Sequence, residues 1–97
     1  MQYMSTQLIA RAKEIRDDKS IVEIVIWQLD EPLKPCKHGY KYRLFYGTFS
    51  ECRVRYDNEH GKGDHVHIRP NEQAYDFDNL ETLLADFERD VTHWIAI

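Results

Sequence analysis

Cysteine, proline and glycine are scarce in this sequence, which has two, three and four of them in 97 residues. Two thiols without CxxC spacing, Cys36 and Cys52, are too few for a disulfide framework, so we expect them to be reduced and structural. No repeat or low-complexity tract is present. Long apolar runs are also missing, since the longest, Ile21 to Ile26, contains Glu23 and falls far short of the roughly 18 residues of a membrane span.

The first residues show neither a basic region nor an apolar one, so we expect no leader segment. Nothing in the sequence indicates export, and we therefore expect a cytoplasmic protein without membrane contact. What the chain does contain is 42% apolar and 12% aromatic residues, which favours a folded chain over disorder. Its length suits one small domain that covers residues 1–97.

The charges are unevenly distributed along the chain. Overall, 13 basic and 17 acidic residues give a formal charge of −4, which excludes a histone-like basic protein. Residues 37–69 nevertheless carry seven cations, four anions and four of the five histidines. A basic, histidine-rich middle inside an acidic protein is the first indication of function.

Apolar periodicity predicts an α+β fold in which an antiparallel sheet precedes one helix. Alternation or β-branched content predicts strands over 21–29, 40–46, 52–57 and 64–69. The ambiguous segment is 5–16, which fits either a helix or the first arm of a hairpin. Apolar residues at helical spacing predict a helix over about 78–95, and Asp78 with Glu81 resembles a capping box at its start.

The strand periodicity gives the sheet two different faces. One face is apolar, and we expect the amphipathic helix to cover it with Phe87 at the centre. That face contains positions 22, 24, 26, 40, 42, 44, 46, 52, 54, 56, 66 and 68. The opposite face is expected to be mostly cationic and to hold Lys41, Arg43, Arg53, Arg55, Asp57, His65, His67 and Arg69. We expect Glu23 to pair with one of these cations, since an unpaired buried carboxylate would be costly.

The densest chemistry lies in residues 55–67, RYDNEHGKGDHVH. Two glycines flank Lys62 and allow a tight loop that can approach a phosphate, although the spacing is not that of a Walker loop. His65 and His67 are two positions apart on a predicted strand, so both rings are expected on the same face. Together with Asp57, Glu59 and Asp64, these histidines could also supply metal ligands.

These residues resemble the TumE family, toxins of bacterial and archaeal type II toxin–antitoxin pairs. The resemblance covers about residues 8–91 and rests on the strings KYRLFY, RYDNExGKGDHxH, YxF and LxDF, with Glu23 and Trp27 matching a Glu-x-x-x-Trp stretch. The family often has Asp-Gly where this chain has Asp18-Lys19, and a basic residue in place of Val66. Alignment to the family favours a hairpin for residues 8–16, which gives a sheet of about five strands over about 8–69.

The resemblance implies a toxin with a cognate antitoxin, which we expect to be a DNA-binding protein. The basic face, the histidine pair and the small size favour a metal-independent ribonuclease acting on cellular RNA, without a cofactor. The predicted catalytic residues are His65, His67, Asp57 and Lys62. The predicted substrate-binding residues are Lys41, Arg43, Arg53, Arg55, Asn58, Glu59, Gly61, Gly63 and Asp64.

Other interpretations of the same residues stay open. A catalytically silent module would use the basic face to bind nucleic acid or an acidic protein segment, or the cations would only keep a solvated face soluble. A metal-dependent nuclease would use the acidic residues together with the histidines. Asp57 and Asn58 also suit a structural turn, and the aligned tyrosines suit a core better than base stacking. A homo-oligomer is compatible with the sequence as well.

Overall fold

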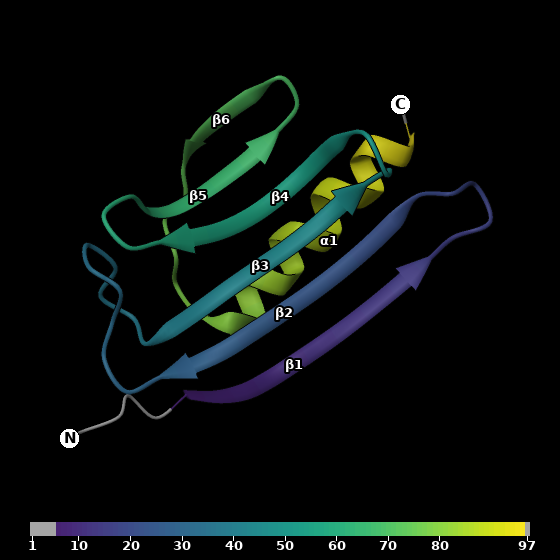
Figure 1. The fold of residues 1–97 in the computed structure, drawn as a ribbon. Coiled ribbons are helices and arrows are strands. Elements are labelled where there is room, and N and C mark those ends of the chain that lie inside the picture. Colours follow the sequence, from purple (N-terminus) through teal and green to yellow (C-terminus); the bar gives the residue numbers. More distant parts are fainter. Residues whose placement is uncertain (1–5, 97) are drawn as a thin grey trace.

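The computed structural model describes residues 6–96, which form one antiparallel sheet and one helix (Figure 1). The elements are β1 (Thr6–Ile15), β2 (Ile21–Leu29), β3 (Tyr40–Gly47), β4 (Cys52–Glu59), β5 (Gly63–Ile68), β6 (Asn71–Ala74) and α1 (Leu80–Ala96). Each strand pairs antiparallel with the next strand along the chain, so the sheet is a meander. The predicted α+β fold is confirmed, but the sheet has six strands instead of about five.

The two outer strands have the weakest signals in the sequence. β1 pairs with β2 from Thr6 to Ile15, so the hairpin interpretation of this segment is confirmed. Its turn places Lys19 at a φ of 72°, a left-handed conformation that glycine adopts more easily than lysine. At the other edge, β6 pairs with β5, although its sequence Asn-Glu-Gln-Ala has no apolar alternation. This strand was missed because its backbone pairing has no counterpart in side-chain hydropathy.

The helix α1 packs against one face of the sheet, behind β3 and β4 in Figure 1. It contributes Leu83, Phe87 and Val91 to a core whose sheet side is formed by Ile26, Tyr42, Leu44, Tyr46, Val54, Tyr56 and Val66. The buried tyrosines are thus core residues. At the helix start, Asn79 Oδ1 accepts the Thr82 N–H at 2.8 Å, so Asn79 is the N-cap and the predicted cap at Asp78 is wrong.

A β-bulge in β4 changes the predicted faces at two positions. Tyr46 pairs with Val54 but Gly47 pairs with Cys52, so one extra residue, Arg53, is inserted into β4. The alternation shifts by one, and Cys52 therefore lies on the face away from α1 instead of in the core. Arg53 lies on the α1 side, where it donates to Tyr46 Oη at 3.2 Å and to Glu51 at 2.6 Å. Both face predictions were wrong, because strict alternation does not anticipate a bulge.

No helix within residues 6–96 has the length and apolar character needed to cross a membrane.

We expect Phe87→Ala to lower the free energy of unfolding by about 3–5 kcal/mol, because Phe87 is 3% exposed at the helix–sheet contact. The matched control is Phe49→Ala, since Phe49 is fully exposed in the β3–β4 turn and should change stability by less than about 0.5 kcal/mol. Urea unfolding followed by circular dichroism measures both. Equal effects of the two changes would contradict the arrangement of α1 on the sheet.

Candidate functional site

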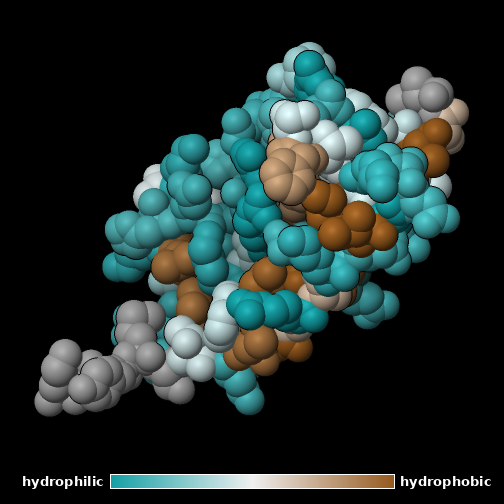
Figure 2. Space-filling model, turned by 45° about the vertical axis from the view of Figure 1, so that its right-hand side comes forward, coloured by the Kyte–Doolittle hydropathy of each residue, from teal (hydrophilic) through white to brown (hydrophobic). Residues whose placement is uncertain are grey.

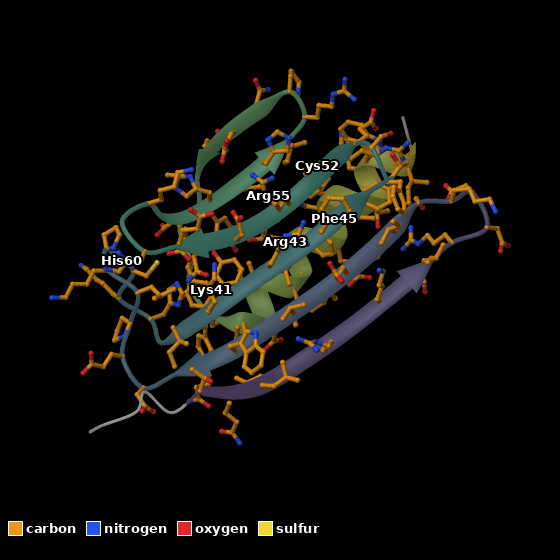
Figure 3. All side chains as sticks on the ribbon, in the orientation of Figure 1. Lys41, Arg43, Phe45, Cys52, Arg55 and His60 are labelled. Atoms are coloured by element: carbon orange, nitrogen blue, oxygen red, sulfur yellow. The ribbon has the colours of Figure 1, made fainter. Side chains whose placement is uncertain are left out.

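The face of the sheet that α1 does not cover, called the open face here, carries two cross-strand rows of side chains (Figure 3). The first row runs from Glu23 through Phe45 and Arg55 to His67 and Glu72. The second row runs from Val25 through Arg43 and Asp57 to His65. The pairing register therefore brings the predicted residues Arg43, Arg55, Asp57, His65 and His67 together on one surface.

The open face is less cationic than the sequence pattern predicted. Arg43 pairs with Glu23 at 3.1 Å, which confirms the expected partner for that carboxylate. Arg55 lies 3.4 Å from Asp57 and 3.6 Å from Glu72, and the Lys41 ammonium donates to the Asn58 carbonyl. Apolar patches are interspersed with hydrophilic side chains on the surface in Figure 2. Most of the open-face cations thus already have partners.

The two histidines have different environments. His65 Nε2 lies 2.9 Å from the Lys62 carbonyl oxygen, which can only accept, so Nε2 carries a proton and Nδ1 of the neutral ring is an acceptor. His67 lies opposite Arg55 across β4 and β5. Among the described residues, Arg55 Nε and His67 Nδ1 are the buried side-chain nitrogens without a hydrogen-bond partner, and the Arg55 Nε has only an ion pair with Asp57 at 3.4 Å. Such unpaired buried groups are costly unless a ligand or water satisfies them.

Cys52 lies beside this pair, with Arg55 Nη1 3.9 Å from its sulfur. Burial raises the pKa of the Cys52 thiol, against the opposing positive charges of Arg55 and Arg43. The thiol form therefore dominates near neutral pH, and Cys52 is a poor nucleophile.

Asn58, predicted to bind substrate, is fully buried and serves the sheet. Its Oδ1 accepts the Tyr42 N–H at 3.0 Å, and its Nδ2 donates to the Tyr40 carbonyl at 2.6 Å. The backbone pairing of β3 with β4 reaches only as far as Arg43 and Asp57. The Asn58 amide thus continues the hydrogen-bond ladder where backbone pairing stops.

The glycine loop, residues 60–63, packs against the connection between β2 and β3. Gly61 has a φ of 86° in a turn closed by the Lys62 N–H donating to Glu59 O at 3.1 Å. The Gly61 N–H donates to Lys34 O at 2.7 Å, and a Cβ on Gly63 would lie 3.3 Å from Pro35 Cγ. The loop amides at 61 and 62 are therefore bonded within the protein, while the Lys62 and Glu59 side chains are exposed.

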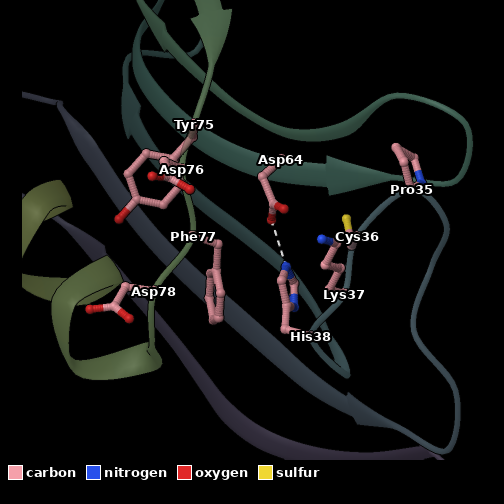
Figure 4. Close-up of a pocket in the computed structure, with 9 residues that line it drawn as sticks. All are labelled: Pro35, Cys36, Lys37, His38, Asp64, Tyr75, Asp76, Phe77 and Asp78. Atoms are coloured by element: carbon pink, nitrogen blue, oxygen red, sulfur yellow. Dashed lines mark hydrogen bonds and ion pairs between the residues drawn. The ribbon is translucent and has the colours of Figure 1, made fainter.

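Asp64 lies on the α1 side of the sheet, away from the histidines that follow it in sequence. It lines a pocket of about 480 Å³ together with Cys36, His38, Tyr75 and Phe77 (Figure 4). His38 Nε2 lies 2.7 Å from Asp64 Oδ1, and the Tyr42 hydroxyl donates to the same oxygen at 2.6 Å. Sequence reasoning missed Cys36 and His38. The available signal was their Cys-x-His spacing within a loop.

Burial and the Asp64 carboxylate together raise the pKa values of two groups beside it. Burial raises the pKa of Cys36, and the hydrogen bond to Asp64 and its negative charge raise it further. Burial and the Asp64 hydrogen bond also raise the pKa of Tyr42 far above its ordinary value. Both groups therefore stay protonated near neutral pH.

The molecule is thus a six-stranded meander with one helix-covered face and one open face that carries a histidine pair. Its sequence matches the model of one protein family, described as Toxin TumE, over residues 4–95. The chain therefore belongs to the TumE toxin family, as its motifs indicated. No match was found among curated proteins or among solved structures. Membership of a toxin family supports a toxin role and implies an antitoxin partner in general.

We expect Asn58→Ala to destabilise the fold by about 1–3 kcal/mol for each backbone group that it leaves unpaired, namely the Tyr42 N–H and the Tyr40 carbonyl. Glu59→Ala is the control, because this neighbouring side chain is exposed. Chemical unfolding of both variants gives the comparison. If Asn58→Ala is as stable as the control, the hydrogen bonds of the Asn58 amide to β3 do not stabilise the sheet.

Proposed function

We propose that this toxin is a metal-independent ribonuclease of a type II toxin–antitoxin pair and that RNA lies on its open face. The single observation that carries the proposal is that Arg55 and His67, cross-strand partners on β4 and β5, each have a buried nitrogen without a hydrogen-bond partner, Nε and Nδ1. The oxygens of a phosphodiester accept hydrogen bonds from guanidinium and imidazolium groups, and they would satisfy the two nitrogens once the side chains turn these buried atoms outward. The pair is therefore assigned to the scissile phosphate.

The neighbouring groups supply the remaining chemistry. Cleavage of RNA without a metal needs a base for the 2′-hydroxyl, an acid for the leaving 5′-oxygen and a cation for the charge on phosphorus. His65, whose Nε2 is held by the Lys62 carbonyl, is assigned as the base through Nδ1. His67 is assigned as the acid and Arg55 as the cation. The two histidines are two residues apart on β5, about 6–7 Å along the strand, a separation that one phosphate can bridge.

Further RNA contacts are assigned to the same face. Lys41 and Trp27 lie opposite one another across β3 and β2, and Arg43 lies in the next open-face row. Aromatic faces stack on bases and cations contact phosphates, so this part of the sheet suits the flanking nucleotides. Asp57 lies between Arg55 and His65 and is assigned to positioning both. The partner antitoxin is proposed to be a DNA-binding protein, with both proteins acting in the cytoplasm.

The test is incubation of the purified protein with RNA, with and without EDTA. Cleavage that survives chelation supports the proposal. Cleavage that is lost in EDTA and restored by Mg²⁺ would instead support a metal-dependent nuclease. A folded, toxic protein that cleaves no RNA would support a catalytically silent binding module that uses the same face.

We expect His65→Ala and His67→Ala each to lower the RNA cleavage rate about 10²–10⁴-fold, the usual contribution of a general acid or base. Neither ring belongs to the apolar core, so the fold should be unchanged by circular dichroism. The control is His93→Ala, an exposed histidine on α1. A double variant of both open-face histidines that stays folded and fully toxic would remove them from the mechanism.

Binding is predicted to depend on salt, because each phosphate contact releases counterions from the RNA. Arg55→Ala should weaken binding of unrelated RNA sequences alike and reduce the slope of log affinity against log salt by about one. Arg89→Ala is the matched control, since this arginine lies on α1 and is paired with Asp86 and Asp90. Fluorescence anisotropy over a salt series measures both slopes. Equal slopes for the two variants would place RNA elsewhere on the protein.

A further inference from the structure

A second cluster of reactive side chains lies on the opposite side of the sheet from the open face. Cys36 and His38 come from the connection between β2 and β3, and Asp64 comes from β5. One ligand atom from each, the sulfur, an imidazole nitrogen and a carboxylate oxygen, lies within 4.8 Å of the others. The sulfur and the imidazole both face Asp64 in Figure 4. The proposed ribonuclease chemistry uses none of these groups.

We infer that Cys36, His38 and Asp64 form a binding site for Zn²⁺. Thiolate, imidazole and carboxylate are the ligands that zinc takes in proteins, whereas Mg²⁺ and Ca²⁺ prefer oxygen ligands alone. One thiolate and one carboxylate neutralise the two charges of the ion. Three protein ligands leave a fourth tetrahedral position, which opens into the pocket of about 480 Å³ that these residues line. The pocket also gives the ion a path of entry.

The groups around the cluster are placed to support the ligands. The Tyr42 hydroxyl donates to Asp64 at 2.6 Å, which leaves the second carboxylate oxygen for the ion. The Asn58 amide lies 3.7 Å from the Cys36 sulfur and donates to it. The His38 ring stacks on Phe77 with 3.8 Å between centroids, which fixes its plane. Outer hydrogen bonds of this kind orient ligands and raise metal affinity.

Zinc would take the place of two protons that point toward Asp64 in the metal-free protein, one on the Cys36 sulfur and one on His38 Nε2. In the metal-free protein, His38 Nε2–H donates to Asp64, while Nδ1 accepts the Tyr40 N–H at 3.2 Å. On binding, Cys36 releases its thiol proton to solvent and forms a Zn–S bond. The imidazole proton moves from Nε2 to Nδ1, so the ring exchanges its hydrogen bonds with Tyr40 and Asp64 for a Zn–N bond and stays neutral.

The bound ion would join two segments that are far apart in sequence. His38 and Asp64 are separated by 26 positions, and the Gly61–Lys34 backbone bond links the same two segments nearby. A ligand that binds only the folded chain raises the melting temperature with its concentration. The ion thus acts as a cross-link at the end of the sheet that carries the glycine loop, independently of any RNA chemistry.

The experiment uses the full chain freed of metal with a chelator. Titration calorimetry with Zn²⁺ should give one ion per chain, and Co²⁺ should give a thiolate-to-cobalt charge-transfer band. Cys36→Ser and His38→Gln should abolish this binding, and Tyr42→Phe should weaken it about 10–100-fold. The controls Cys52→Ser and His93→Gln remove the same side-chain types elsewhere and should bind as the parent protein does.

The parent protein and the Cys52→Ser control test the proposed zinc site even if a ligand variant fails to fold. A charge-transfer band that persists in Cys52→Ser assigns the thiolate to Cys36, the other cysteine of the chain. Absence of the band in the parent protein overturns the inference, as does loss of the band in Cys52→Ser. Because the readout is metal binding, neither result depends on whether the protein cleaves RNA.

Discussion

The buried amide of Asn58 joins β4 to β3 at the end of the sheet beside the Cys36–His38–Asp64 cluster. It bonds to two backbone groups of β3 where the backbone ladder to β4 has ended, and it donates to the sulfur of Cys36. Its neighbours Asp57 and Glu59 point the other way because side chains alternate along a strand. One short stretch of β4 therefore supplies Asp57 to the open face on one side of the sheet and Asn58 to the Cys36–His38–Asp64 cluster on the other.

The regular parts of this fold could be predicted from the sequence because side-chain hydropathy follows them. β3 and α1 each bury a stripe of apolar residues whose period of two or 3.6 is visible without a structure, and β2 is recognisable by its β-branched residues. Irregularities have no such signal. The bulge at Arg53 exchanges the faces of two residues, and β6 forms through backbone pairing of four exposed residues. Both depend on the neighbouring strand, which a local pattern does not contain.

The candidate sites likewise have features that the sequence pattern predicts and features that it does not. Alternation alone places Arg43, Arg55 and both histidines on one face, and the register confirms that face. It does not reveal the ion pairs or the unsatisfied nitrogens, since these depend on side-chain rotamers and cross-strand distances. Cys36 and His38 reach Asp64 only through the path of an irregular connection. No periodicity describes such a connection, so their meeting could not be predicted from the residues.

If RNA binds the open face as proposed, the ion pairs of this face decide where its phosphate binds most easily. Where a cation already has a carboxylate partner, as Arg43 has Glu23, a phosphate must compete with that carboxylate and gains little. Arg55 also has carboxylate neighbours, with Asp57 lying 3.4 Å from its Nε, but neither this Nε nor His67 Nδ1 has a hydrogen bond that a phosphate would have to break. In the proposed complex, the hydrogen bonds that a phosphate would gain are therefore those to the Arg55–His67 pair beside His65, where the chemistry is assigned. Under the proposed function, ion-paired surroundings with one pair of nitrogens that lack hydrogen bonds would localise a phosphate better than a uniformly basic face, which attracts RNA without positioning it.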